Sequence, residues 1–499
     1  MNTPDYVAAV LASADAGGIH NAELAALRRR LRQLGDPQAG LLPGAVLEPL
    51  ADLPRLDELP EPPPGRARDV LGRLVVVKLN GGLGTSMGLP GPKSLLQVKP
   101  GISFLDVLAM QVLALRERHS ARLPLVLMNS AATRGPSLDV LRRQGGLPVP
   151  GVPVDFLQGR EPQVRADDWQ PVRWPAGPQL EWCPPGHGDI YTALAASGTL
   201  DALLGAGLRY AFVSNSNNLG ALAEARLAAW LAAEQVPFAI EAVRGTPADR
   251  KGGHLARYRD RVVLRETAQV PSGDTSLTDV ERWRWDNTNN IWIDLRALAG
   301  LQATDPAAPA LPLIVNHKTV DPREAASTPV IQLESAMGAA TGSIPGARAL
   351  HVPRSRFAPV NTTGDLLAVR SDAYQLTSDG QMSPSFDGPG PVVTLDKDFC
   401  RLLPGFEQRF PRRGTVAAPL PPVPGRRRRH LRQGRRSRGR RAGGRPASHP
   451  ARRGTHRKNP NRRPDTGHDA ARHRVVQPPS RHRASHPAAA EDLAPPHPA

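Results

Sequence analysis

The sequence predicts an α/β fold, with a mainly parallel sheet flanked by helices, from two observations. Strand-like and helix-like segments alternate from residue 70 to about residue 370. This alternation is typical of βαβ units, in which ligands bind at the carboxyl ends of the strands. The chain before residue 412 is also near-neutral and long enough to bury a large core.

Each element is predicted from an apolar run and its periodicity. An Ala- and Leu-rich first region has a helical pattern at 22–34 and ends in a Pro-rich linker at 59–65. Short apolar or β-branched runs predict strands at 74–78, 123–128, 210–214, 238–243, 290–293 and 366–369. Longer periodic runs predict helices at 104–119, 137–144, 190–204 and 219–233. The expected division is a helical region at 1–65, a main domain at 66–390, a short segment at 391–411 and a tail at 412–499.

The positive charge of the chain is confined to the tail. Residues 412–499 hold 23 basic and 4 acidic side chains, which leaves 41 basic and 42 acidic side chains in the preceding 411 residues. The net charge of +18 therefore does not identify the main domain as a nucleic-acid binder.

The tail contains no Phe, Tyr or Trp and is rich in Pro, so we expect it to be disordered. Its Arg, Ala, Pro and Gly have the codons richest in G and C. One interpretation is therefore a reading frame that slips near Pro411, which makes the tail an out-of-frame translation. The other is a basic arm whose arginine runs, such as Arg426 to Arg429, neutralise nucleic-acid phosphates.

Two further features limit the class of protein. Cys183 and Cys400 are the only cysteines, which gives neither a disulfide framework nor metal-ligand spacing. We see no apolar run of membrane-spanning length and no secretory pattern at the N-terminus. A cytoplasmic location is the expectation.

The segment at residues 75–98, VVVKLNGGLGTSMGLPGPKSLLQV, is the most informative in the chain. The β-branched run that opens it suits a buried strand. Gly81, Gly82 and Gly84 let the backbone approach a ligand and present N–H groups to phosphate oxygens. Lys93 adds a mobile cation within reach of that turn. The segment predicts a site for a nucleoside triphosphate or a sugar nucleotide.

Two common phosphate-binding motifs do not fit this segment. The dinucleotide fingerprint needs G-x-G-x-x-G, but the interval from Gly84 to Gly88 is one residue too long. The Walker A loop needs Gly-Lys-Ser, but Pro92 separates Gly91 from Lys93.

The segment instead resembles the signature of eukaryotic-type UTP–glucose-1-phosphate uridylyltransferases, and the resemblance extends over roughly residues 45–411. It implies a Rossmann-like nucleotide-diphospho-sugar transferase domain at 66–390, with Mg²⁺ as cofactor. UTP, glucose 1-phosphate, UDP-glucose and pyrophosphate would be the ligands. The nucleotide contacts in this segment would come from Leu79, Asn80, Gly81, Gly82 and Lys93.

Two further segments resemble the part of the family that reads uracil and holds the sugar phosphate. In residues 156–162, FLQGREP, Gln158 would pair with uracil, because an amide both donates and accepts hydrogen bonds. In residues 182–189, WCPPGHGD, Gly188 would lie against uracil and His187 would contact glucose 1-phosphate. The alternative for His187 is a structural role, as the cap of a following helix.

Residues 210–221, YAFVSNSNNLGA, resemble a strand and turn in which an aspartate helps to hold Mg²⁺. This chain has Asn217 at that position, which brings an amide oxygen without a charge. Asn215 in the same turn would hold the sugar phosphate. Affinity for the metal is therefore expected to be reduced.

The hexose would be bound by two more segments. Residues 286–292, DNTNNIW, resemble a family turn in which Asn289 would bind sugar hydroxyls. Glu334 lies in residues 331–338, IQLESAMG, which resemble another part of the sugar pocket. Asn-rich segments are also common in ordinary turns.

Residues 352–367 resemble a segment in which a lysine grips the phosphates during transfer, and this chain has Asn361 there. Lys93 and Asn361 are the predicted catalytic positions, and Arg354 and Arg356 lie close by in sequence.

Residues 404–410, PGFEQRF, match the lead-in to a C-terminal left-handed β-helix, which we expect to be absent.

The predicted reaction is UTP plus α-D-glucose 1-phosphate giving UDP-glucose and pyrophosphate. One alternative is a catalytically impaired relative that only binds sugar nucleotide, because two charged positions have become asparagines. The other is a nucleic-acid-binding factor that uses the tail. The sequence leaves the exact sugar and the oligomeric state open.

Overall fold

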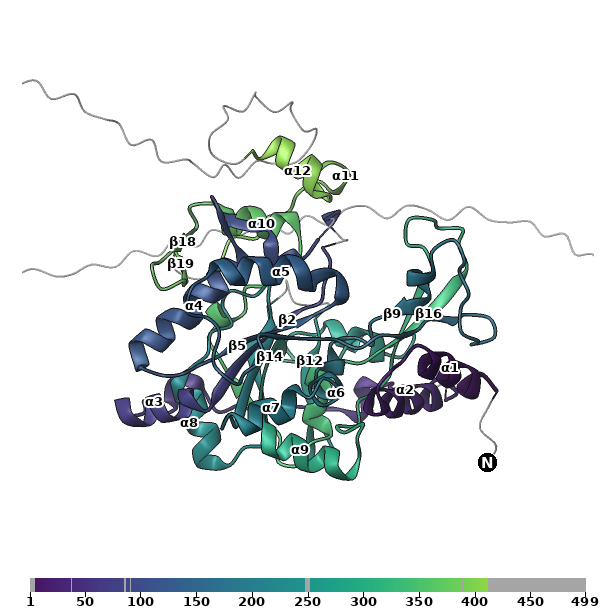
Figure 1. The fold of residues 1–499 in the computed structure, drawn as a ribbon, viewed down its shortest axis with the longest axis horizontal. Coiled ribbons are helices and arrows are strands. Elements are labelled where there is room, and N and C mark those ends of the chain that lie inside the picture. The colour runs from purple at the N-terminus through teal and green to yellow at the C-terminus, as the bar shows by residue number, and fades with distance from the viewer. Residues whose placement is uncertain are drawn as a thin grey trace, which may run out of the picture. The chain divides into compact units, whose positions relative to one another are not determined.

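The computed structural model describes residues 5–36, 38–84, 87–89, 91–246, 252–386 and 390–411, which belong to one compact unit (Figure 1). The tail at 412–499, with its expected disorder and the expected absence of a β-helix, lies outside the described residues. Within the described ranges no helix is long and apolar enough to cross a membrane.

A ten-stranded mixed sheet forms the centre of this unit. Four neighbouring strands in it are parallel, in the order β10 (Tyr210–Asn215), β2 (Leu74–Asn80), β5 (Leu125–Asn129) and β6 (Asp155–Leu157). Antiparallel pairing continues the sheet from β10 to the long strand β14 (Trp285–Asp294). The remaining strands are β1 (Glu48–Pro49), β11 (Phe238–Arg244), β12 (His254–Tyr258), β13 (Arg261–Arg265) and β17 (Arg348–His351), of which β11 and β17 form a separate parallel pair.

Helices cover both faces of the sheet (Figure 1). Along β2 the side chains alternate between two buried clusters, with Leu74 and Val76 in one and Val75 and Val77 in the other. The first cluster includes residues of α3 (Pro64–Gly72), α4 (Phe104–His119), α5 (Ala131–Arg143), α8 (Ala225–Glu234) and α10 (Thr363–Arg370). The second includes residues of α6 (Ile190–Ala196), α7 (Thr199–Gly205) and α9 (Leu295–Thr304). The prediction of an α/β fold with a parallel central sheet is confirmed.

The first two helices pack on a smaller three-stranded sheet. Residues of α1 (Asp5–Ala16) and α2 (Asn21–Leu34) share a buried cluster with β15 (Ile314–Thr319), β16 (Pro329–Glu334) and β8 (Val164–Arg165). The short pairs are β3 (Gln97–Lys99) with β4 (Ile102–Ser103), β7 (Glu161–Pro162) with β9 (Trp182–Cys183), and β18 (Tyr374–Leu376) with β19 (Met382–Pro384). Helices α11 (Lys397–Cys400) and α12 (Leu403–Arg409) follow.

Most predicted elements are present, but one was assigned wrongly. Residues 366–369, predicted as a strand, lie in helix α10. Thr362 caps this helix by accepting from the N–H of Asp365, and Asp365 accepts in return from the N–H of Thr362. This capping box was present in the sequence and outweighs the β-propensity of the apolar run.

Three predicted helices differ in extent. The one expected at 137–144 begins six residues earlier, at Ala131. The one expected at 190–204 is broken into α6 and α7 by Gly198, which has a φ of 69°. The one expected at 219–233 begins only at Ala225.

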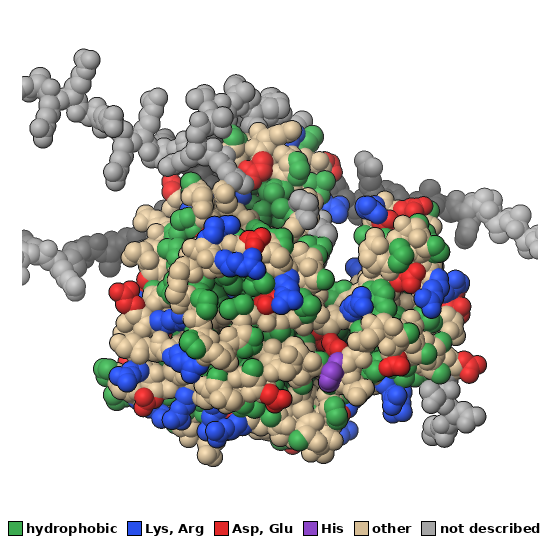
Figure 2. All heavy atoms as spheres, in the orientation of Figure 1, with side chains coloured by type: hydrophobic (Ala, Val, Ile, Leu, Met, Phe, Trp, Pro, Cys, Tyr) green, Lys and Arg blue, Asp and Glu red, His purple; other side chains and the backbone are tan. Residues whose placement is uncertain are grey.

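Figure 2 shows basic and acidic side chains interspersed over the face in view, which agrees with the near-neutral charge of this part of the chain.

Candidate active site

The carboxyl ends of four parallel strands meet at one edge of the main sheet. The register places Asn215 of β10 opposite Leu79 of β2, and Asn80 opposite Asn129 of β5. Asn129 in turn lies opposite Leu157 of β6. The segments predicted to bind the nucleotide and the sugar phosphate therefore leave the sheet side by side, at the edge where α/β folds bind ligands.

The glycine-rich loop leaves β2 and returns as a narrow hairpin. Leu83 pairs with Pro92 across it, and the N–H of Lys93 donates to the carbonyl of Gly82 at 3.4 Å. Gly82 is exposed and Lys93 is half-buried. The structure thus places the Lys93 backbone directly beside the glycine turn, as the sequence predicts.

Lys93 contacts one of the two asparagines at the unusual positions, and that asparagine contacts the other. Its Nζ donates to Oδ1 of Asn361 at 3.3 Å, and Nδ2 of Asn217 donates to the same oxygen at 3.0 Å. Nδ2 of Asn217 also donates to the carbonyl of Val360 at 2.9 Å. Burial lowers the pKa of Lys93, against the nearby negative charge of Asp365. Two positions 144 residues apart in the chain therefore form one small cluster with this cation.

Gln158 lies against the glycine turn. A Cβ atom on Gly81 would be 2.0 Å from Oε1 of Gln158, so this close approach depends on the missing side chain. The N–H of Gln158 donates to the carbonyl of Asn129 at 2.7 Å, which fixes the start of its loop. The next residue, Gly159, donates its N–H to Oδ2 of Asp189 at 2.6 Å. The loop that carries Gln158 is thereby tied to the segment that carries His187.

The Pro-Pro-Gly-His-Gly segment packs tightly on the residues that follow β16. Gly186 has a φ of 80°, and a Cβ atom on it would lie 2.6 Å from the carbonyl oxygen of Ser335. The N–H of Gly188 donates to that carbonyl at 2.8 Å. Nδ1 of His187 accepts from the N–H of Met337 at 3.0 Å. Backbone contacts on both sides therefore aim the imidazole.

These contacts also set the protonation of His187. Burial lowers its pKa to about 4, so the ring is neutral at neutral pH. Because Nδ1 accepts a hydrogen bond, the ring proton is on Nε2, which is then a donor. The alternative role as a helix cap is not observed, since α6 begins at Ile190 with Asp189 at its N-cap and no side chain capping it.

Asn289 lies in a bulge of β14. Its φ is 55°, its N–H donates to Oδ1 of Asn287 at 2.8 Å, and Nδ2 of Asn287 donates to its Oδ1 at 3.0 Å. The pairing of β14 with β11 shifts register at this point. A Cβ atom on Gly338 would lie 3.4 Å from Nδ2 of Asn287, which connects the bulge to the segment after β16. Bulges of this kind redirect side chains near functional sites.

The remaining predicted residues occupy different environments. Asn215 and Glu334 are half-buried, at the ends of β10 and β16. The amide of Asn80 is buried and donates to Asn129 and Ser137 at 2.7 and 2.8 Å. The side-chain nitrogen of Asn80 therefore joins β2 to β5 and α5.

Three comparisons with known proteins agree with this geometry. A family model described as UTP–glucose-1-phosphate uridylyltransferase matches residues 47–418. The enzyme of that name from Solanum tuberosum is 38% identical over 352 residues, covering 70% of this chain and 72% of its own. The one from Saccharomyces cerevisiae is 38% identical over 344 residues, covering 68% of each chain.

Solved structures give the same result at the level of the fold. A point mutant of UDP-glucose pyrophosphorylase from Leishmania major, in complex with UDP-glucose, is 39% identical, with a TM-score of 0.77 over 82% of this chain and 88% of that chain. A UDP-glucose phosphorylase from Trypanosoma brucei is 41% identical, with a TM-score of 0.75 over 81% and 87%. The chain belongs to the UTP–glucose-1-phosphate uridylyltransferase family.

The candidate site also contains a buried ion pair that the sequence reasoning missed. Glu241 of β11 accepts from Nε and Nη2 of Arg356 at 2.8 and 2.5 Å, from Nδ2 of Asn290 at 3.0 Å and from Nε1 of Trp292 at 2.9 Å. Glu241 is fully buried and Arg356 is 6% exposed. Arg356 therefore does not replace the lysine that the family carries at position 361. A lone glutamate within the apolar run FAIEAVR was the available signal.

The ion pair is connected to the turn that carries Asn217. Nδ2 of Asn218 donates to the carbonyl of Arg356 at 3.0 Å, and its Oδ1 accepts from the N–H of Ala358 at 3.1 Å. Buried Lys78 of β2 donates to Oγ of Ser214 and to the carbonyl of Ala221, at 2.7 and 2.8 Å. The turn is thus fixed at both ends, and burial lowers the pKa of Lys78 to about 7.

The residues around Asn217 are a poor fit for a Mg²⁺ site of the usual kind, which relies on carboxylates. Asn217 offers one neutral oxygen, and its Nδ2 donates to the carbonyl of Val360 and to Oδ1 of Asn361. Asp365 accepts from the N–H groups of Asn361 and Thr362 and so serves as a helix cap. The described part of the chain contains no group of three His, Cys, Asp or Glu side chains that could hold a metal.

Proposed function

We propose that this chain transfers the uridylyl group of UTP to α-D-glucose 1-phosphate, giving UDP-glucose and pyrophosphate in a reversible reaction. The observation that carries the proposal is the chain of contacts from Lys93 through the glycine turn and Gln158 to His187. It brings together a lysine that would bind phosphate, an amide that would read uracil and a neutral imidazole. Family membership supports the same reaction.

In this proposal a phosphate oxygen of glucose 1-phosphate attacks the α-phosphorus of UTP in line. A new P–O bond forms while the bond from the α-phosphorus to the bridging oxygen breaks, and pyrophosphate leaves with that electron pair. Such a transfer needs mainly positioning and neutralisation of charge. Lys93 and the N–H groups of Gly81 and Gly82 would supply the neutralisation, with Asn361 holding the lysine in place.

Uracil would be selected by Gln158, whose amide offers both a donor and an acceptor to the ring edge. Gln158 lies against Gly81, so one nucleotide could contact both the glycine turn and the amide of Gln158. This proximity supports the role of Gln158 in reading the base. The packing of Gly188 on Ser335 and Leu311 leaves no room for a side chain at the position proposed to face the base.

The sugar phosphate would be bound by Asn215 and by the Nε2–H of His187. A neutral imidazole donates without adding a charge that would compete with Lys93 for phosphate. Asn289, in its bulge, and Glu334 would bind the hexose hydroxyls. Glucose as the hexose rests on the family, since galactose differs from it at a single hydroxyl.

We propose that Mg²⁺ arrives bound to UTP, because Asn217, at the position where the resemblance implies an aspartate, would contribute a neutral oxygen and no charge. A cytoplasmic location also stays a prediction, supported by the two buried, unpaired cysteines.

The test is pyrophosphate release by the purified full chain from UTP and glucose 1-phosphate, with and without Mg²⁺. We expect turnover in the wild type and a loss of about 10²–10³-fold in Lys93→Ala, because one charge that stabilises the transition state is removed. Lys397→Ala, on helix α11, is the matched control and should keep wild-type turnover. Binding of UDP-glucose without any release of pyrophosphate would contradict the proposed catalysis.

A further inference from the structure

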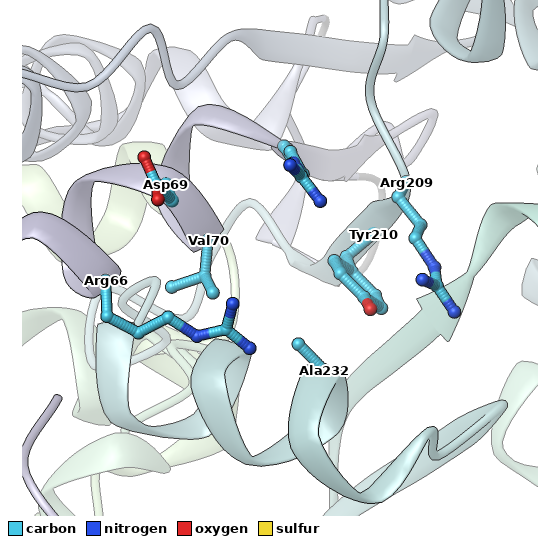
Figure 3. Close-up of a pocket in the computed structure, with 7 residues that line it drawn as sticks. Arg66, Asp69, Val70, Arg209, Tyr210 and Ala232 are labelled. Carbon is cyan, nitrogen blue, oxygen red and sulfur yellow. The ribbon is translucent and has the colours of Figure 1, made fainter.

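A hollow of about 180 Å³, drawn in Figure 3, lies beside the first residues of β2 and β10. The candidate active site lies at the other end of these strands. The hollow is lined by Arg66, Val70 and Arg73 around helix α3, by Arg209 and Tyr210 at the start of β10, and by Ala232 of α8. β2 runs from the hollow to the glycine loop over the seven residues 74–80. At about 3.3 Å per residue, the two places are roughly 20 Å apart.

The hollow carries positive charge that is not neutralised. Arg209 is paired with Asp294, at 3.0 Å from Nε and 2.9 Å from Nη2. Arg66 and Arg73 make no ion pair with any described residue, although Asp69 also lines the hollow and lies on the same helix as Arg66. Two guanidinium groups against one carboxylate leave a net positive site.

A buried phenol completes the set of donors. Tyr210 is 2% exposed, and its hydroxyl has no hydrogen-bond partner among the described residues. Figure 3 shows this hydroxyl and the guanidinium of Arg66 facing the same hollow. Burial raises the pKa of Tyr210, against the nearby charges of Arg209, Arg66 and Arg73, so the phenol keeps its proton and is available as a donor.

The backbone holds these groups in a fixed arrangement. The carbonyl of Arg73 accepts from the N–H of Arg209 at 2.8 Å and from the N–H of Tyr210 at 3.0 Å. The backbones of Arg73 and Arg209 are therefore placed by the pairing of β2 with β10, and that of Arg66 by helix α3. Positioned donors of this kind reduce the conformational cost of binding.

We propose that this hollow is a binding site for a phosphate group, either inorganic phosphate or the terminal phosphate of a monoester, separate from the candidate active site. Guanidinium forks match the oxygens of a phosphate in pairs, and a phenol O–H donates to a further oxygen. The volume accommodates one such group.

The test is ¹⁹F NMR of the full chain labelled with 3-fluorotyrosine. The sequence contains five tyrosines, so Tyr210→Phe assigns the relevant signal by its disappearance. Inorganic phosphate and O-phosphoserine are titrated separately at constant ionic strength. We expect a saturable shift of the Tyr210 signal, and the compound that saturates at the lower concentration identifies the source of the phosphate.

The variants decide whether the hollow is responsible. Arg66→Gln with Arg73→Gln should weaken binding at least tenfold. Arg68→Gln should leave it unchanged, because Arg68 is an exposed arginine on the same helix that does not line the hollow. The arginine-rich tail is present in every variant and so cannot account for a difference between them.

An unmoved Tyr210 signal at millimolar phosphate would overturn the proposal, and so would an equal shift in the double variant. Thermal unfolding gives a second readout. At constant ionic strength, phosphate should raise the unfolding midpoint of the wild type and of Arg68→Gln more than that of the double variant. None of these readouts depends on uridylyl transfer.

Discussion

Asn217 and Asn361 are hydrogen-bonded to each other at 3.0 Å, and Lys93 donates to the same oxygen of Asn361. The family resemblance places an aspartate and a lysine at these two positions. An Asp–Lys pair and an Asn–Asn pair have the same net charge, so the two changes together leave the total charge around Lys93 unaltered. This contact could not be read from the sequence, because 144 residues separate the two positions.

We therefore expect the two substitutions to be coupled. Asn361→Lys alone places a second cation beside Lys93 without a counter-charge. Asn217→Asp alone adds a carboxylate that can pair with Lys93 and draw it away from phosphate. Asn217→Asp with Asn361→Lys should raise the rate of pyrophosphate release at least about tenfold. Steady-state kinetics of the four proteins in this double-mutant cycle tests the coupling, and additive effects of the single variants would contradict it.

His254 gives a prediction for the dependence of stability on pH. It is 1% exposed, stacks on Trp283 with ring centroids 4.7 Å apart, and its Nε2 has no hydrogen-bond partner. Burial lowers its pKa to about 3, and the charge of Arg265 adds to this effect. The unfolded chain therefore binds a proton at about pH 6.5 that the folded chain does not bind.

The stabilisation provided by His254 should be complete above pH 6.5 and should be lost as the pH falls toward 3. The free energy of unfolding of the wild type, minus that of His254→Gln, should fall by about 1.4 kcal/mol per pH unit below pH 6.5. Taking the difference removes the opposing contribution of buried Glu161, whose pKa is raised to about 7 by burial. Urea unfolding at several pH values measures this difference, with exposed His317→Gln as the control substitution. A difference that is constant from pH 7 to pH 5 would refute the assignment.

At the scale of elements, the ion pair of Glu241 and Arg356 holds three pieces of the site together. Glu241 lies on β11 and fixes the bulge of β14 through Asn290, while Arg356 begins the segment that carries Asn361. Asn218 attaches that segment to the turn after β10. The position of the Asn217–Asn361 cluster thus depends on a buried charge pair that need not touch a ligand.

Glu241→Gln should lower the free energy of unfolding by about 3–5 kcal/mol, because it leaves the buried guanidinium of Arg356 without a counter-charge. It should also lower kcat, through displacement of Asn217 and Asn361. Glu234→Gln is the matched control, since Glu234 forms an exposed pair with Arg348 at 3.6 Å and should cost less than about 1 kcal/mol. Chemical denaturation and steady-state kinetics measure both effects. Wild-type stability in Glu241→Gln would show that the pair has no structural role.

How well an element was predicted depended on whether its signal was local. The strand at 74–78 and the helix at 104–119 were predicted from their apolar runs alone; the observed strand extends to Asn80, and the observed helix has the predicted limits. Helix α10 was missed because its signal, the capping box from Thr362 to Asp365, is only four residues long. The bulge at Asn289 and the partner of Glu241 depend on contacts between segments far apart in the chain. The lone glutamate in FAIEAVR marks Glu241 as unusual, but no local pattern identifies Arg356 as its partner.

At the scale of the whole molecule, the charge is divided between two parts of the chain. Residues 1–411 hold 41 basic and 42 acidic side chains, and residues 412–499 hold 23 and 4. The catalytic proposal uses only the first part. Binding to nucleic acid, if the chain shows it, should come only from the second, because affinity for the phosphate backbone depends on the number of cations that neutralise it.

A chain that ends at Pro411 should therefore separate uridylyltransferase activity from binding to nucleic acid. We expect it to keep the uridylyltransferase activity of the full chain and an unfolding midpoint within about 2 °C of it, because the described core clusters lie entirely before that residue. A gel shift of double-stranded DNA by the full chain should weaken steeply with added salt and should be absent in the shortened chain. Polylysine of similar charge is the control for non-specific polycation binding. A shortened chain that fails to fold, or that loses turnover while remaining folded, would mean that residues beyond 411 belong to the enzyme and are not an independent basic segment.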